Sequence, residues 1–108
     1  MKAQALHGHL DALLLAVLEH KPLHGYAIIE ALEARSDGSL SPPTGTIYPA
    51  LRRLERAGYV DSSWSTVNGR ERRTYRLTPA GRGALAGERS AWVEFSSTVG
   101  RFLGEAPA

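Results

Sequence analysis

The sequence has 108 residues, of which 43% are hydrophobic and 22% charged, as expected for one small globular domain. It contains no cysteine, which excludes a disulfide framework and thiolate chemistry. Its apolar runs are too short to span a bilayer and the N-terminus lacks a signal-peptide pattern, so we expect a cytoplasmic protein. The formal net charge is only +2, but arginines concentrate between residues 52 and 76, which favours an anionic partner.

Two helices are predicted in the first third of the chain. Leucine and valine recur at helical spacing between residues 6 and 18, which predicts a helix over residues 4–20 that ends before Pro22. Its apolar stripe is wide, so this helix needs burial on more than one side. A second helix is predicted over residues 26–35, with its isoleucines and leucine facing inward. Residues 36–43 are rich in glycine, serine and proline and indicate a loop.

Residues 44–56 are predicted to form a helix with two different faces. Thr44 is the expected N-cap, and Gly58 is the expected stop. At about 100° per residue, one stripe is apolar and comprises Ile47, Ala50, Leu51 and Leu54. The opposite stripe comprises Gly45, Pro49, Arg52 and Arg56, with Tyr48 and Arg53 beside it. Small residues followed by arginines on an exposed face suit close approach to a polyanion.

Pro49 conflicts with the simplest form of this helix, because a proline removes one intrahelical donor and crowds the carbonyl of Gly45. We therefore expect a local distortion near the first turn. In an alternative interpretation, Pro49 is the first helical residue and residues 44–48 are loop. Positions that break local rules are frequently under functional demand, so the segment from Thr44 to Pro49 is a candidate contact region.

A β-hairpin is predicted after this helix, because Asn68-Gly69 lies between two strand-like runs. A two-residue turn there pairs Val67 with Arg70, and counting outward sets the remaining register. One face then carries the pairs Trp64 with Arg73, Ser62 with Tyr75 and Val60 with Leu77, and the other carries Asp61 with Arg76 and Ser63 with Thr74. A basic cluster is expected at the tip of this projecting ribbon, formed by Arg70, Arg72 and Arg73. A basic helix followed directly by a basic hairpin has the outline of a winged helix-turn-helix.

A long last helix is predicted over residues 79–103, with Thr78 as its cap and Pro79 as its first residue. At 1.5 Å per residue it is about 36 Å long, which exceeds the width of a small domain. An apolar seam recurs along it, formed by Trp92, Phe95, Val99 and Phe102. We expect a second copy of the chain to cover this seam, while the alternative is a helix that folds back on its own domain.

The chain resembles the PadR family of bacterial transcriptional regulators, and four segments carry the resemblance. They are Leu23-His24-Gly25-Tyr26, Leu40-Ser41-Pro42, the run from Thr44 to Glu55 that contains Gly-Thr-Ile-Tyr-Pro-Ala-Leu, and the run from Arg72 to Gly81. The family habitually has Pro-Gly where this chain has Thr44-Gly45. The resemblance implies a mainly α fold with a small β-hairpin: a winged helix-turn-helix DNA-binding domain over residues 1–78, then a C-terminal dimerisation helix and tail over residues 79–108.

The resemblance also implies which residues meet DNA and which meet a second chain. The helix around residues 46–56 is expected to enter the major groove, and the wing to touch the flanking backbone. The candidate DNA-contact residues are Thr44, Thr46, Tyr48, Arg52, Arg53, Arg56, Arg70, Arg72 and Arg73. Short members of the family pair through the last and first helices, so the candidate dimer-interface residues are Leu10, Leu14, Trp92, Phe95, Val99 and Phe102.

Several of these side chains have a second interpretation. The hydroxyl of Tyr48 is expected on a DNA phosphate, but its ring could instead pack against the second helix. Trp64 is interpreted as packing on the wing under Arg73 rather than stacking on a base. Trp92 is either part of the dimer core or the wall of a cavity for a planar aromatic effector, since relatives respond to phenolic acids or hydrophobic drugs.

Other chemistries have little support in the sequence. His7 and His9 point to different sides of a helix and His20 and His24 straddle Pro22, so we expect solvated histidines and no metal. Serine, histidine and aspartate show no nucleophile-and-base spacing, so we expect neither an enzyme nor a cofactor.

Two functions therefore remain. The first is a homodimeric repressor that binds an inverted-repeat operator in double-stranded DNA and is released by a small aromatic or hydrophobic effector. The alternative is a winged-helix module that only contacts proteins.

Overall fold

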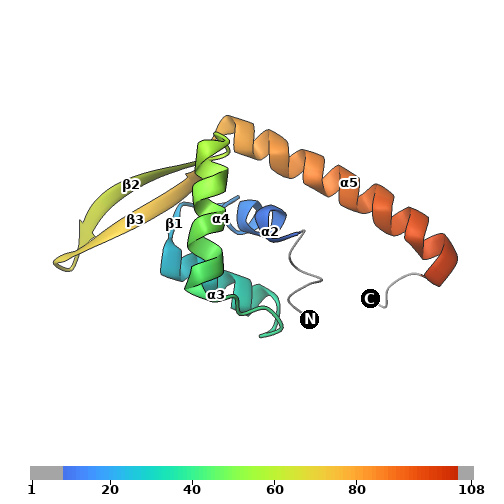
Figure 1. Cartoon of the computed structure of the whole chain (residues 1–108), viewed down its shortest axis with the longest axis horizontal. Helices are drawn as coiled ribbons and strands as arrows, with labels where there is room; N and C mark the ends of the chain where they lie inside the picture. Colours follow the sequence, from blue (N-terminus) through green and yellow to red (C-terminus); the bar gives the residue numbers. More distant parts are fainter. Residues whose placement is uncertain (1–8, 105–108) are drawn as a thin grey trace.

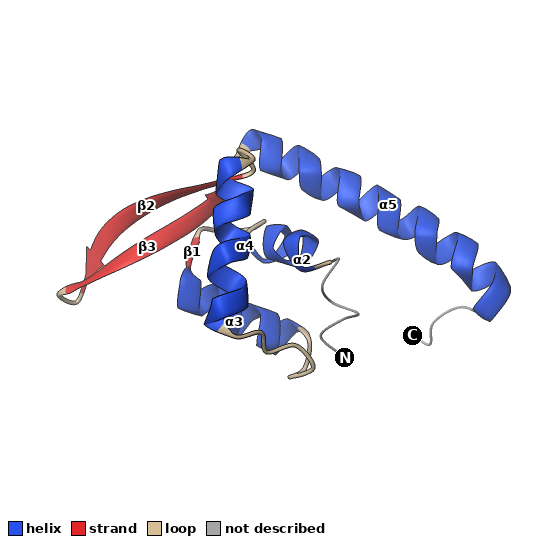
Figure 2. Ribbon diagram, viewed as in Figure 1, coloured by secondary structure: helices blue, strands red, loops and turns tan. Residues whose placement is uncertain are grey.

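The computed structural model describes residues 9–104 and contains four helices and three strands within them (Figure 1). The elements in chain order are α2 (Leu10–Val17), β1 (Leu23–His24), α3 (Gly25–Arg35), α4 (Thr44–Arg56), β2 (Val60–Val67), β3 (Arg70–Leu77) and α5 (Pro79–Leu103). The helices and the sheet form a small domain from which the hairpin and α5 project in different directions (Figure 2). The predicted fold class, mainly α with a small β-hairpin, is confirmed.

The first two predicted helices are both present, with different bounds. The described part of the first predicted helix is α2, which ends at Val17 with Leu18 as its C-cap. Residues 4–8 of that prediction, with His7, lie outside the described residues. The predicted tail from residue 105 onward also lies outside them. Helix α3 begins one residue before the predicted start. Its N-cap is His24, whose ring Nδ1 accepts a hydrogen bond from the backbone N–H of Ala27 at 3.3 Å. His24 is therefore a capping residue and not a solvated histidine.

Helix α4 contains Pro49, so the interpretation that places Pro49 at the first helical position is wrong. The prediction of Thr44 as N-cap is also wrong, because Thr44 is the first helical residue and Pro43 is the cap. The carbonyl of Pro43 accepts from the N–H groups of Thr46 and Ile47, at 2.9 and 3.2 Å, so an upstream carbonyl replaces a side-chain cap. Gly58 has a φ of +81° and ends the helix, as predicted.

The sheet has three antiparallel strands in the order β1-β3-β2. Every predicted pair of the hairpin is confirmed, from Val67 with Arg70 at the turn to Val60 with Leu77 at the base. Both turn residues, Asn68 and Gly69, have positive φ values of 52° and 76°, as a tight hairpin turn requires. The third strand, β1, was not predicted; its two residues pair with Tyr75 and Thr74 of β3.

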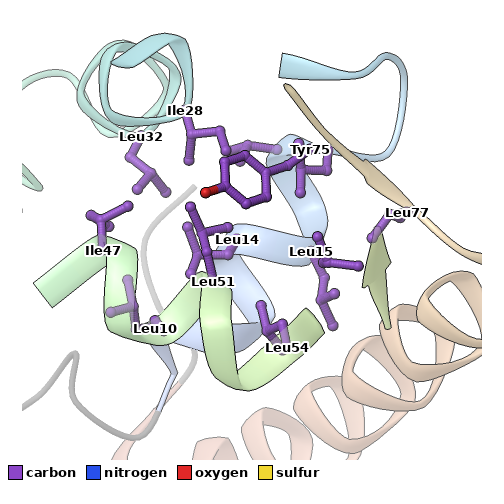
Figure 3. Close-up of a cluster of buried hydrophobic side chains, with 14 of the residues drawn as sticks. Leu10, Leu14, Leu15, Ile28, Leu32, Ile47, Leu51, Leu54, Tyr75 and Leu77 are labelled. Atoms are coloured by element: carbon purple, nitrogen blue, oxygen red, sulfur yellow. The ribbon is translucent and has the colours of Figure 1, made fainter. Parts of the chain in front are cut away.

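The hydrophobic core lies where α2, α3, α4 and β3 meet (Figure 3). Leu14 and Leu51 are fully buried near its centre, and the Tyr75 ring packs beside them. Leu14 has an exposed fraction of 0% and Leu10 of 7%, so both belong to the core of their own chain. Their assignment to a dimer interface is therefore wrong. Because α2 is surrounded by α3, α4 and α5, its wide apolar stripe is used within the domain.

Helix α5 starts as predicted, with the Thr78 hydroxyl accepting from the N–H of Gly81 at 3.0 Å. Gly81 and Leu85 are buried, so the first turns of the helix pack on the domain. Further along, the guanidinium of Arg89 donates two hydrogen bonds of 2.7 Å to the carboxylate of Glu19, just after α2. These bonds lower the pKa of Glu19 to about 2. Beyond this ion pair α5 extends away from the other elements (Figure 1), so it does not fold back over its full length.

Candidate nucleic-acid interface

The face of α4 that points away from the core is exposed and basic. The apolar stripe is buried as predicted, comprising Ile47, Ala50, Leu51 and Leu54. The opposite side is exposed along its whole length, comprising Thr44, Gly45, Thr46, Pro49, Arg52, Arg53 and Arg56. Among residues 9–104, no atom lies within 4 Å of a methyl group added at Gly45, so the first turn offers open space to an approaching molecule.

The three arginines of α4 differ in what they contact. The Arg53 guanidinium donates to a carboxylate oxygen of Asp11, on α2, at 2.9 Å. Within residues 9–104, neither Arg52 nor Arg56 has a hydrogen bond or ion pair to another side chain. Within the described residues, Arg52 and Arg56 are therefore the cations of the helix without a polar partner, whereas Arg53 uses one nitrogen, Nη2, for its contact with Asp11.

A cleft of about 780 Å³ separates α4 from the wing, the hairpin of β2 and β3. We call it the wing cleft. Residues from α4, the wing and the start of α3 line it: His24, Gly25, Tyr26, Tyr48, Arg52, Glu55, Trp64, Arg70, Glu71, Arg72, Arg73 and Tyr75. Four arginines against two glutamates give this concave surface a positive balance, and aromatic rings supply its apolar area.

Arg73 does not lie free at the wing tip, because its guanidinium is bound within the domain. It donates from Nε to the Ser62 hydroxyl at 2.8 Å and from Nη2 to the Glu55 carboxylate at 3.1 Å. Its central carbon lies 5.7 Å from the centre of the Trp64 ring and 5.9 Å from that of Tyr75. The prediction that Trp64 packs with Arg73 is confirmed. These contacts connect the base of the wing to α4 and hold the two at a definite angle.

The other two wing arginines lie in different environments. Arg70 is exposed beside the turn. Arg72 is half-buried, and its Nη1 lies 3.2 Å from Nε2 of His24. This contact was not predicted from the sequence, although His24 lies two residues before the predicted start of the second helix, near where a capping residue is expected.

The Tyr48 ring packs against the start of α3. A methyl group added at Gly25 would lie 2.5 Å from the Tyr48 hydroxyl oxygen and 2.6 Å from the ring carbon Cε1. The absence of a side chain at Gly25 therefore makes room for the ring, which supports the packing interpretation. The side chain stays 37% exposed and lines the wing cleft, so it also remains a candidate DNA contact.

The outer half of α5 carries an exposed apolar surface. Large side chains more than half exposed are Trp92, Val93, Phe95, Phe102 and Leu103. Trp92 meets the ring of His9 edge to face with 6.1 Å between centroids, and lies 6.1 Å from the Phe95 ring. Such a surface on a single chain indicates an interaction site.

Among residues 9–104, no three histidine, aspartate or glutamate side chains are grouped so that they could hold a metal ion. No helix in this part of the chain has the length and apolar character needed to cross a membrane.

The fold, with a basic helix flanked by a projecting hairpin, is that of a winged helix-turn-helix protein. Residues 14–87 match the PadR-like family of transcriptional regulators. The transcriptional regulator Rv3488 of Mycobacterium tuberculosis is 42% identical over 91 residues, which cover 82% of each chain. The chain therefore belongs to the PadR-like family of transcriptional regulators.

Solved structures agree with this assignment. A transcriptional regulator from Clostridium thermocellum is similar with a TM-score of 0.86 and 25% identity, over 93% of this chain and 98% of that chain. PadR of Bacillus subtilis, solved in complex with operator DNA, is similar with a TM-score of 0.67 and 25% identity, over 73% of this chain and 45% of that chain.

Proposed function

We propose that this protein is a homodimeric repressor that binds specific sequences in double-stranded DNA. The observation that carries the proposal is the exposed face of α4, where Arg52 and Arg56 make no hydrogen bond or ion pair to a side chain of residues 9–104 and lie beside the positive wing cleft. The B. subtilis relative bound to operator DNA supports it. Long donor side chains on an exposed helix suit base edges in the major groove, where arginine binds guanine with two hydrogen bonds.

The proposed DNA contacts lie on α4 and on the wing. On α4 and its first turn, the proposed groove-facing residues are Thr44, Thr46, Tyr48, Arg52, Arg53 and Arg56. On the wing, Arg70 and Arg72 are proposed to bind backbone phosphates. Arg73 was expected in the same role, but its bonds to Glu55 and Ser62 assign it to orienting the wing.

Dimer formation through α5 follows from its exposed apolar surface. Trp92, Phe95, Val99 and Phe102 lie at steps of three and four residues and therefore share one side of the helix. A two-fold axis beside this side of α5 would bury these apolar side chains against the same side chains of a second chain. It would also place the two α4 helices of the dimer so that both can contact one DNA duplex. The expected site is an inverted repeat with half-sites about 34 to 36 Å apart.

Trp92 is also the proposed contact for an effector that releases DNA. Its side chain is 57% exposed, and its neighbours His9 and Phe95 are flat rings that suit an aromatic molecule. If Trp92 holds the effector while the other seam residues hold the dimer, Trp92→Leu should leave the dimer and its DNA affinity largely intact while abolishing effector-induced release. A variant that dissociates instead would place Trp92 in the dimer core and remove the effector proposal.

Selecting bound fragments from genomic DNA, followed by fluorescence anisotropy on the selected duplex, tests the proposal. Arg52→Ala should weaken specific binding by about 1 to 3 kcal/mol and relax the preference at one base pair. Arg101→Ala is a matched control, since it removes the same charge at the far end of α5. Binding that depends on salt but shows no preference for any fragment would contradict sequence-specific regulation.

A further inference from the structure

The ring of His24 faces two hydrogen-bond donors and can accept from only one of them. Nδ1 lies 3.3 Å from the backbone nitrogen of Ala27, in the first turn of α3. Nε2 lies 3.2 Å from Nη1 of Arg72, on β3. A neutral imidazole has one acceptor nitrogen and one N–H, whereas a guanidinium and a backbone amide only donate. One of the two contacts is therefore not a hydrogen bond.

The position of the ring decides which nitrogen accepts. His24 is the N-cap of α3, where the first N–H groups have no partner within the helix and the helix dipole is positive. A proton on Nδ1 would face the N–H of Ala27 and this positive end. Arg72 has a long side chain that can turn its other N–H groups elsewhere. Nδ1 is therefore the acceptor, and the proton is on Nε2.

With the proton on Nε2, two donors point into the same space, and no oxygen atom of residues 9–104 accepts a hydrogen bond from either of them. They are Nε2–H of His24 and the guanidinium of Arg72, and both residues line the wing cleft. An oxygen atom that carries negative charge satisfies both donors at once. Arg52 and Arg70 line the same cleft and add positive charge around this position.

We propose that His24 and Arg72 together bind one phosphate of the DNA backbone at the α3 end of the wing cleft. The inference rests on the proposed DNA-binding function and adds a residue to it that lies outside both α4 and the wing. His24 acts through its two nitrogens in two roles. Nδ1 stabilises the start of α3, and Nε2–H contacts the phosphate, so the same ring that caps α3 at the end of β1 positions the DNA backbone.

Two substitutions separate these roles. In His24→Asn, the amide oxygen can replace Nδ1 as a good N-cap, but no donor reaches the position of Nε2. In His24→Gln, the longer side chain can place an N–H near the former Nε2, while glutamine is not a favoured cap. We therefore expect the asparagine variant to remain as stable as the natural protein and to bind DNA less well. We expect the glutamine variant to be less stable than the natural protein and to bind DNA about as well.

The protonation of the ring can be measured directly in the free protein. Long-range ¹H–¹⁵N correlation spectra of the full chain distinguish a protonated from an unprotonated imidazole nitrogen. The expected result for His24 is a protonated Nε2 and an unprotonated Nδ1. The opposite tautomer would overturn the proposal, because Nε2 would then accept from Arg72 and no free pair of donors would exist.

The DNA contact is measured by fluorescence anisotropy with a 30-base-pair duplex of random sequence over a series of salt concentrations. Non-specific binding comes from phosphate contacts, so no operator is needed. His24→Asn should bind roughly tenfold more weakly at every salt concentration, with an unchanged salt slope because a neutral donor is lost. Arg72→Gln should reduce the slope of log affinity against log salt concentration by about 0.9 per lost phosphate contact. The variant that combines both substitutions should lose less binding free energy than the two single variants lose together.

The outcomes distinguish this inference from the function on which it rests. A natural protein that does not bind duplex DNA would refute the proposed function. Natural binding that His24→Asn retains in full, with the variant folded, would refute the phosphate contact alone. Inorganic phosphate at constant ionic strength provides the last comparison. If it moves the Nε2–H resonance of His24 while DNA affinity is independent of His24, the site takes a free anion and the DNA assignment is wrong.

Discussion

Two glycines in the first turns of α5 should respond in opposite ways to the same substitution. Gly81 is buried, and a methyl group added there would overlap the backbone carbonyl oxygen of Tyr59 and lie 2.9 Å from its carbon. Gly83 lies two residues further along the same helix, and no atom of the described part of the chain lies within 4 Å of a methyl group added there. Comparing alanine at these two positions therefore distinguishes the effect of steric overlap, present only at Gly81, from the gain in helix propensity, present at both.

The obstacle at Gly81 is backbone, so it cannot rotate away as a side chain can. The Tyr59 carbonyl also accepts the N–H of Thr78 at 3.1 Å. Moving it costs about 1 to 3 kcal/mol of overpacking strain and endangers a hydrogen bond of about 1 kcal/mol. Alanine gains about 1 kcal/mol of helix propensity. The net expectation for Gly81→Ala is a loss of about 2 kcal/mol, and for Gly83→Ala a gain of about 0.5 to 1 kcal/mol.

Thermal and urea unfolding followed by circular dichroism measure both variants. Because a dimer adds stability that depends on concentration, each curve is recorded at several equal protein concentrations. The expected change in Tm for Gly81→Ala is a decrease on the order of 10 °C. Equal stability of the two variants would refute the close approach of α5 to Tyr59 and with it the packing of the first turns of α5 on the domain.

Three further predictions concern the contacts between elements. Because hydrogen bonds from α5 lower the pKa of Glu19 from 4.5 to about 2, its stabilising effect is complete above pH 4.5 and is lost as the pH falls toward 2. Glu19→Gln should flatten the unfolding free energy against pH in that interval, and an unchanged profile would contradict the ion pair. Glu55→Gln removes the ion pair with Arg73 and should weaken DNA binding roughly fivefold, although it also removes a negative charge from the cleft. Tighter binding at all salt concentrations would show that the pair does not orient the wing. Gly25→Ala should lower the free energy of unfolding in urea by about 1 to 3 kcal/mol. When Tyr48 is already alanine, the same substitution should cost much less, whereas additive losses in the double variant would argue against the contact.

Elements defined by neighbouring residues were predicted well from the sequence. The hairpin register is correct because Asn68-Gly69 specifies a tight turn, and every later pair follows by counting from it. The start of α5 is correct because Thr78 is an N-cap residue directly before Pro79, and its hydroxyl accepts from the N–H of Gly81 only three residues away. The apolar stripe of α4 was found for the same reason, since helical periodicity is visible within one element. Family membership also follows from contiguous motifs.

Contacts between distant segments were decided by the tertiary structure. Arg53 meets Asp11 across 42 positions of sequence, Arg72 meets His24 across 48, and Arg73 meets Glu55 across 18. Composition and spacing identify these arginines as cations, but only the packed elements show that two of them are bound to carboxylates.

The sequence by itself therefore determined the helices and the hairpin, which faces are apolar or basic, and which family the chain belongs to. Only the tertiary structure decided that Leu10 and Leu14 are used inside the domain and that β1 adds a third strand. It also decided which arginines stay free. The physical reason is that local periodicity and turn chemistry depend on neighbouring residues. A side chain's burial and its partner depend instead on which elements pack together after folding.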